Sequence, residues 1–158
     1  LPDKAGTPPI ALHPYATHPD KAWKEAYWRQ LMELFESRGI PWIVIGRGNG
    51  MEGIPASRNF TNRTSLRETC ALLKSSSLLI TGDSGPMHLA GAVGTPVLAL
   101  FAPTTEEWGF FPAGPKDRVL ESQLDCRPCT LHGKKHCDRN HACMQSITPE
   151  QVMRALDE

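Results

Sequence analysis

Two short apolar segments, separated by little more than a turn and a small helix, constrain the fold most. Residues 78–81 (LLIT) and 97–100 (VLAL) are nearly continuous apolar runs, which is typical of strands buried on both faces of a parallel sheet. Between them, residues 87–93 leave room for about two helical turns. Pro86 suits the start of that helix because it has no N–H to satisfy, and Gly94 suits a left-handed exit. The segment therefore predicts a strand, a tight turn, a helix and a second, parallel strand.

Strands and helices alternate along the rest of the chain. Four further segments predict strands, the third of them weak: residues 10–13, 42–45, 59–61 and 118–120. Three further segments predict helices: residues 23–38, which end at Gly39, residues 65–74, which begin with a capping box of Ser65 and Glu68, and a terminal helix that Thr148 caps. This alternation predicts a doubly wound, mainly parallel α/β sheet with right-handed crossovers. We expect residues 1–9 to be a linker and residues 10–158 to form one domain.

The composition excludes several classes of protein. The chain has 158 residues, of which 40% are hydrophobic and 22% are charged, as in an ordinary globular domain. Seventeen basic residues balance seventeen acidic ones, so the net charge favours no nucleic-acid partner. No apolar run approaches the roughly 18 residues of a membrane span, and no segment resembles a signal peptide. The polar, proline-rich start at Leu1, without a methionine, indicates a piece of a longer protein.

Three loops of unusual composition follow predicted strands. They are residues 14–21, 46–53 and 82–85. Ligands of doubly wound sheets bind beyond the carboxyl ends of the strands, near the topological switch point. The coincidence of three such loops at strand ends therefore predicts a ligand site at that edge of the sheet.

The loop at residues 82–85 (GDSG) leads directly into a predicted helix. A helix N-terminus carries unpaired N–H groups and a partial positive charge, glycines let an anion approach, and Ser84 adds a hydroxyl donor. Asp83 repels phosphate, so its carboxylate is better suited to accept hydrogen bonds from sugar hydroxyls beside the phosphates. The alternative is a tight turn in which Ser84 or Asp83 only caps the helix.

Three more residues are candidates for this site. Lys21 could neutralise a diphosphate, or be a solvated surface lysine. His88, about one turn into the helix, could reach the phosphate end, or be a packed residue. The loop GRGNG at residues 46–50 lacks the G-x-G-x-x-G spacing of a dinucleotide site. We interpret it as a flexible loop, with Glu52 as a hydroxyl acceptor for a ribose.

Three segments of the chain, in the same order, are similar to signature segments of the bacterial heptosyltransferases, which form glycosyltransferase family nine. They are IALHPYATHPDKAWKEAYWRQL, GDSGPMHLAGAVGTPVLALFAPT and LDCRPCTLHGKKHCDRNHACMQSITPEQV. The resemblance covers nearly the whole chain from Ile10, but only the C-terminal half of the family's two-domain GT-B fold. It implies a Rossmann-like half-domain that binds a nucleotide sugar. The N-terminal half, with the acceptor site and the proposed catalytic aspartate, would lie outside this chain.

The resemblance also implies roles for individual residues. Carried over by position, seven residues would form the nucleotide-sugar site: Thr17 and Lys21 at the diphosphate, Ser84 and Gly85 at a phosphate, Asp83 near the donor sugar, His88 in the same helix, and Glu52 at the ribose. The adenine would lie near residues 60–66. No catalytic residue is implied within this chain, so the isolated chain would be inactive.

The implied reaction is transfer of heptose from ADP-heptose to the lipid A core acceptor of the lipopolysaccharide inner core, with no cofactor required. The diphosphate is the leaving group, so Lys21 and the helix N-terminus would stabilise the charge that develops on it. The enzyme would act in the cytoplasm at the inner face of the inner membrane, and the basic loop at residues 132–135 is a candidate for contact with anionic headgroups. The alternative is a non-catalytic nucleotide- or metal-binding module used for assembly or regulation.

Four of the five cysteines lie close together near the C-terminus: Cys126, Cys129, Cys137 and Cys143. The first two have the spacing of half a tetrahedral zinc site, and the other two could complete a structural zinc site, although their own spacing is wider than usual. Three histidines lie among them as competing ligands: His132, His136 and His141. The alternatives are reduced thiols packed in a loop, or disulfides.

Overall fold

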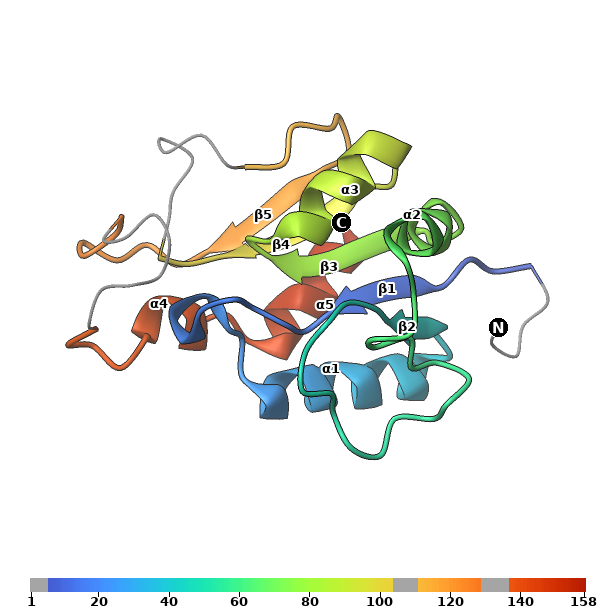
Figure 1. Ribbon diagram of the computed structural model, residues 1–158. Coiled ribbons are helices and arrows are strands. Elements are labelled where there is room, and N and C mark those ends of the chain that lie inside the picture. The colour runs from blue at the N-terminus through green and yellow to red at the C-terminus, as the bar shows by residue number, and fades with distance from the viewer. Residues whose placement is uncertain (1–5, 104–110, 129–136) are drawn as a thin grey trace.

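Five parallel strands form one sheet in the order β2-β1-β3-β4-β5 (Figure 1). The computed structural model describes residues 6–103, 111–128 and 137–158. The strands are β1 (Ile10–His13), β2 (Trp42–Val44), β3 (Leu78–Gly82), β4 (Val97–Phe101) and β5 (Arg118–Glu121). The predicted parallel sheet is confirmed, with each of these strands ending within one residue of its prediction. Because β2 lies on one side of β1 and β3 on the other, the switch point falls between β1 and β3.

Alternate strand residues pack against two different layers of helices. The helices are α1 (Glu25–Arg38), α2 (Leu66–Lys74), α3 (Gly85–Val93), α4 (Ala142–Gln145) and α5 (Pro149–Asp157). Leu12 and Ile80 pack in one core with residues of α1 and α5. Ala11 and Leu79, one position earlier, pack in a second core with residues of α2 and α3. The helices of the described residues therefore cover both faces of the sheet, as Figure 1 shows, which favours a ligand site at the strand ends.

The predicted helix ends are confirmed where side chains or glycines define them. Ser65 and Glu68 form both bonds of a capping box at the start of α2, and Thr148 forms another with Gln151 at the start of α5. Gly39 after α1 and Gly94 after α3 are left-handed, with φ of 64° and 78°. These signals act within four residues of chain, which is why the sequence predicts them well.

Four features differ from the sequence prediction. Helix α1 begins at Glu25 and not at residue 23, because the indole N–H of Trp23 donates to the Ile147 carbonyl at 2.8 Å and holds Trp23 outside the helix. The weak strand at 59–61 is only a single bridge between Val44 and Asn59. There the Asn59 side chain accepts from the Thr61 N–H, which turns the chain out of an extended path. A short 3-10 helix, Pro19–Lys21, and helix α4 were not predicted.

Candidate nucleotide site

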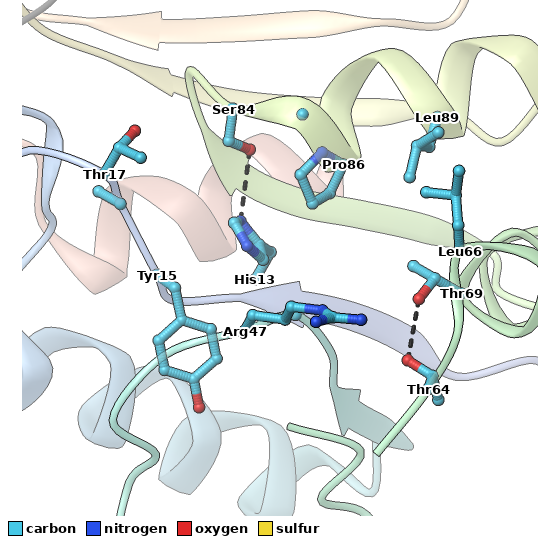
Figure 2. A pocket seen from close by; sticks show the side chains of 13 residues that line it. His13, Tyr15, Thr17, Arg47, Thr64, Leu66, Thr69, Ser84, Pro86 and Leu89 are labelled. Atoms are coloured by element: carbon cyan, nitrogen blue, oxygen red, sulfur yellow. Dashed lines mark hydrogen bonds between the residues drawn. The ribbon is translucent and has the colours of Figure 1, made fainter. Parts of the chain in front are cut away.

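A cavity of about 480 Å³ lies at the carboxyl ends of β1 and β3, at the switch point (Figure 2). All three loops that the sequence analysis selected contribute to its wall, through Thr17, Arg47 and Ser84 among others. The start of α2 contributes Leu66, and α3 contributes Leu89. The prediction that three loops meet at one edge of the sheet is therefore confirmed, and both polar and apolar side chains line the cavity.

The start of α3 is open toward this cavity. Ser84 occupies the N-cap position, yet its hydroxyl accepts no hydrogen bond from the helix backbone. Gly85 lines the cavity, and a Cβ added there would meet no atom within 4 Å. The capping alternative for Ser84 is therefore wrong. A nine-residue helix whose first turn is uncapped and faces open space has the features of an anion site.

Lys21 and Asp83 form an ion pair beside the cavity. Lys21 Nζ donates to Asp83 Oδ2 at 2.5 Å, and the two side chains are only 10% and 11% exposed. Lys21 is therefore not a solvated surface lysine, and Asp83 uses its carboxylate for this pair. Neither residue is among the cavity's lining residues. Separating an ion pair of such low exposure is costly unless each charge gains another partner.

His13 is a site residue that the sequence analysis missed. It ends β1 and is 6% exposed, and its Nδ1 lies 3.0 Å from the hydroxyl of Thr81, its register partner at the end of β3. Burial lowers the pKa of His13 from 6.5 to about 4, so the imidazole is neutral at pH 7. The sequence does show a polar residue at the end of each of two apolar strands, His13 and Thr81. This signal indicates a shared site only when β1 and β3 are known to be neighbours.

Tyr15 is a second missed residue, and it explains the glycines of the loop at residues 46–50. A Cβ at Gly46 would lie 2.4 Å from His13 Cδ2, and one at Gly48 would lie 2.3 Å from the Tyr15 ring. The Tyr15 hydroxyl hydrogen-bonds to Thr61 at 2.6 Å, and burial raises its pKa. Gly46 and Gly48 therefore make room for the ring of His13, at the end of β1, and the ring of Tyr15, in the first loop. This is a different role from the flexibility that we expected.

The other predicted site residues are spread around the cavity. Thr17 lines it. Glu52 is exposed and lies outside the lining, and its backbone carbonyl accepts from Arg29 at 2.9 Å. His88 is exposed on α3 and also lies outside the lining, so the packed alternative for this histidine is wrong. The structure therefore brings Thr17, Ser84 and Gly85 together at the cavity, and leaves Glu52 and His88 farther out.

Only part of the predicted cysteine site can be described. Cys129, with the basic loop and two of the competing histidines, lies outside the described residues. His141 pairs with Asp20 at 3.2 Å through its ring, and its backbone N–H donates to Cys137 Sγ at 3.2 Å. Cys143 is buried in the core. Among the residues that the structure describes, no three metal-ligating side chains form a group that could hold a metal ion.

We expect mild acid to destabilise the fold through His13. The pKa of this side chain is about 4 in the folded chain and near 6.5 when it is unfolded. Between these values the unfolded chain binds a proton that the folded chain excludes, so the free energy of unfolding falls as the pH falls. The loss is about 2 kcal/mol between pH 7 and pH 5. Urea denaturation of the wild type and of His13→Gln at both pH values measures it. Equal pH dependence in the two proteins would contradict the assignment.

The fold is a doubly wound α/β sheet with a cavity at its switch point. The chain belongs to glycosyltransferase family 9 (heptosyltransferase), whose family model matches residues 2–138. It is 32% identical, over 91% of its length, to lipooligosaccharide heptosyltransferase 2 of Campylobacter jejuni serotype O:2. It is 33% identical, over 84% of its length, to lipopolysaccharide heptosyltransferase 1 of Pseudomonas aeruginosa. The chain spans less than half of these relatives, 48% and 38% of their lengths.

Solved structures share the fold over nearly the whole chain. The E. coli ADP-heptose lipopolysaccharide heptosyltransferase II matches with a TM-score of 0.75 and 23% identity, over 98% of this chain and 46% of that one. TibC, an iron-containing dodecameric glycosyltransferase of enterotoxigenic E. coli, matches with a TM-score of 0.76 and 24% identity, over 99% of this chain and 46% of that one. The predicted Rossmann-like half of a GT-B glycosyltransferase is thus confirmed. None of the helices in the described ranges has the length and apolar character needed to cross a membrane.

Proposed function

We propose that this chain is the donor-binding domain of a heptosyltransferase that transfers heptose from ADP-heptose to the lipopolysaccharide inner core. The observation that carries the proposal is the open start of α3 at the switch point, with the Ser84 hydroxyl in the cavity wall and the Lys21 ammonium beside it. This arrangement suits a diphosphate. Membership of the family supports it, and so does the solved complex of TibC with ADP-D-β-D-heptose.

The proposed chemistry needs charge stabilisation and no cofactor. As the bond between the anomeric carbon and the diphosphate breaks, negative charge grows on the departing diphosphate. The α3 N-terminus and Lys21 would stabilise that charge. The base that deprotonates the acceptor is expected outside this chain. The apolar wall around Leu66 and Leu89 suits the adenine, close to the predicted residues 60–66.

The ion pair of Lys21 and Asp83 would change partners when the donor binds. A diphosphate offers Lys21 a more highly charged partner than one carboxylate. Asp83, released from the lysine, would then accept hydrogen bonds from hydroxyls of the donor sugar. In this division of roles the carboxylate bonds to the sugar and not to the phosphates, and Thr17 and Gly85 would make the remaining contacts with the phosphates. Glu52 and His88 would need to approach the donor from the outer part of the site.

Calorimetry with the isolated chain tests the proposal. We expect ADP to bind more tightly than UDP, because the proposed apolar wall fits a purine. Binding should be weak, since a GT-B donor is normally enclosed by both halves. We also expect no release of ADP when ADP-heptose and a lipid A core acceptor are added. Absence of ADP binding at millimolar concentration would reject the donor-site assignment, and turnover by the isolated chain would contradict the expected location of the base.

The acceptor and the place of action are part of the same proposal. A lipid A core acceptor is anchored in a membrane, so the whole enzyme would act in the cytoplasm at the inner face of the inner membrane. The acceptor would bind to the other half of the enzyme. The basic loop that we considered for contact with anionic headgroups lies outside the described residues.

We also propose a structural metal site at the clustered cysteines, Cys126, Cys129, Cys137 and Cys143. Cys126 and Cys137 lie near one guanidinium: the pKa of Arg139 is raised mainly by Asp125 and, to a smaller extent, by these two cysteines. The backbone N–H of His141 donates a hydrogen bond to Cys137 Sγ, and such a bond supports a metal-bound thiolate. Zinc suits four thiolates, and iron is the metal named for TibC. Such a site would stabilise the C-terminal segment and take no part in catalysis.

Elemental analysis for zinc and iron, with thiol titration, tests this site on protein purified without added metal. About one metal ion per chain, with the four thiols protected, would support it. No metal, with all four of these thiols reactive in addition to Cys70, would reject it. No metal, with thiols missing in pairs, would indicate disulfides.

A further inference from the structure

We propose that His13 is a positioning residue of the donor site, which directs the Ser84 hydroxyl toward the phosphate bound at the start of α3. The inference rests on the proposed function, because it assigns His13 a task at that same nucleotide site. His13 would not itself carry charge to the ligand. It would act through Thr81 and Ser84. Of these three residues, Ser84 is the one that would donate to the phosphate.

Three polar groups lie within hydrogen-bond distance of one another at the ends of β1 and β3. His13 Nδ1 is 3.0 Å from Thr81 Oγ1, which is 2.9 Å from Ser84 Oγ. The distance from Ser84 Oγ back to His13 Nδ1 is 3.3 Å. Thr81 is fully buried and His13 nearly so, while Ser84 is the least buried of the three. His13 and Ser84 both line the cavity, as Figure 2 shows, and Thr81 does not. The set is therefore anchored at the buried Thr81, and Ser84 is its most accessible member on the ligand side.

The protons of this set decide what Ser84 can offer. Each hydroxyl has one proton. If Nδ1 carries a proton, it donates to Thr81, Thr81 donates to Ser84, and the Ser84 proton remains for a ligand. If Nδ1 carries no proton, it accepts a hydrogen bond from the Thr81 hydroxyl. Thr81 then has no proton left for Ser84, so the Ser84 hydroxyl must donate its own proton to Thr81 and has none for a ligand. An imidazole with its proton on Nδ1 therefore leaves the Ser84 hydroxyl free to donate to a phosphate.

The surroundings of His13 suit a fixed, neutral donor. Gly46 backs the ring so closely that a Cβ there would lie 2.4 Å from His13 Cδ2, and Tyr15 packs against it in a T-shaped contact with centroids 5.9 Å apart. The ring therefore has little freedom to turn away from Thr81. Because its pKa is about 4, it stays neutral at pH 7, and the positive charge of the site comes from Lys21 and the helix. Direction, and not charge, is what His13 contributes.

Two amide variants separate positioning from packing. His13→Asn places an amide nitrogen about where Nδ1 lies, whereas His13→Gln places its amide about where Nε2 lies and fills more of the imidazole volume. We expect ADP affinity of the 158-residue chain to stay within about threefold of wild type in His13→Asn, and to fall about tenfold in His13→Gln. Adenosine, which lacks a phosphate, should bind equally to all three proteins. A side chain that only fills space would give the opposite order, since glutamine is closer to histidine in size.

Ser84→Ala provides the second arm of the experiment. In that background, calorimetry should show no further loss of ADP affinity from His13→Gln, because the hydroxyl that His13 directs is gone. Thermal melts check that the variants fold. If His13→Asn does not fold, the comparison of His13→Gln in the wild-type and Ser84→Ala backgrounds is sufficient. Binding by His13→Gln as tight as by His13→Asn, or an undiminished loss in the Ser84→Ala background, would overturn the role of His13. Failure of the wild type to bind ADP would instead reject the proposed function.

Discussion

Replacing Lys21 by alanine is expected to weaken ADP binding by roughly one to two orders of magnitude, and AMP binding far less. The lysine side chain is only 10% exposed, so a hydrogen bond from it to a charged phosphate would be poorly screened by water. The ammonium would interact mainly with the second phosphate, which AMP lacks, so the loss should be larger for ADP than for AMP. Calorimetry with both nucleotides measures the difference. Equal losses for AMP and ADP would show that Lys21 does not lie at the diphosphate.

Asp83 makes the Lys21 experiment sharper. In Lys21→Ala the carboxylate loses its partner at 2.5 Å and remains as an uncompensated charge beside the phosphates. The double variant Lys21→Ala/Asp83→Asn should therefore recover part of the ADP affinity. Asp83→Asn alone should leave ADP affinity unchanged or improved, and lower transfer by the full-length enzyme. Lys24→Ala is the matched control, because Lys24 lies nearby with its ammonium 5.4 Å from the Tyr27 ring centroid. A large loss of ADP affinity in Asp83→Asn would contradict a sugar-side role for that residue.

Gly46→Ala is expected to lower the free energy of unfolding by about 4 kcal/mol and to abolish ADP binding. Two costs add. The residue has φ of 112°, which an L side chain rarely adopts, and the new Cβ would lie 2.4 Å from His13 Cδ2. His13 cannot move aside without breaking its bonds to Thr81 and Ser84. Urea denaturation measures the loss of stability, and calorimetry measures the loss of binding.

Gly50→Ala is the matched control for this variant. Gly50 lies in the same loop and has φ of 78°, but a Cβ there would meet no atom within 4 Å. It should therefore carry only the backbone cost, about 1 kcal/mol, and leave ADP binding intact. Similar losses of stability in the two variants would mean that the contact with His13 is unimportant, and that only the backbone conformation matters.

Local signals explain why the elements could be predicted from the sequence. The apolar runs of β1, β3 and β4, the capping box of Ser65 and Glu68, and the left-handed Gly39 and Gly94 each depend on interactions within a few residues of chain. The alternation of such elements is compatible with few architectures besides a doubly wound sheet. The same reasoning failed at residues 59–61, where the Asn59 side chain turns the chain after a single bridge.

The composition of the site depends on contacts between distant parts of the chain. Lys21 and Asp83 are 62 residues apart and His13 and Thr81 are 68 apart, and they meet only because β1 and β3 are neighbours in register. No local pattern shows that Gly46 makes room for an imidazole. The sequence by itself determined the elements, the class of sheet and the loops that reach the ligand edge, because propensity, capping and apolar periodicity act locally. Only the tertiary structure decided which polar groups pair there and which stay open to a ligand, because strand order and register follow from packing over the whole core.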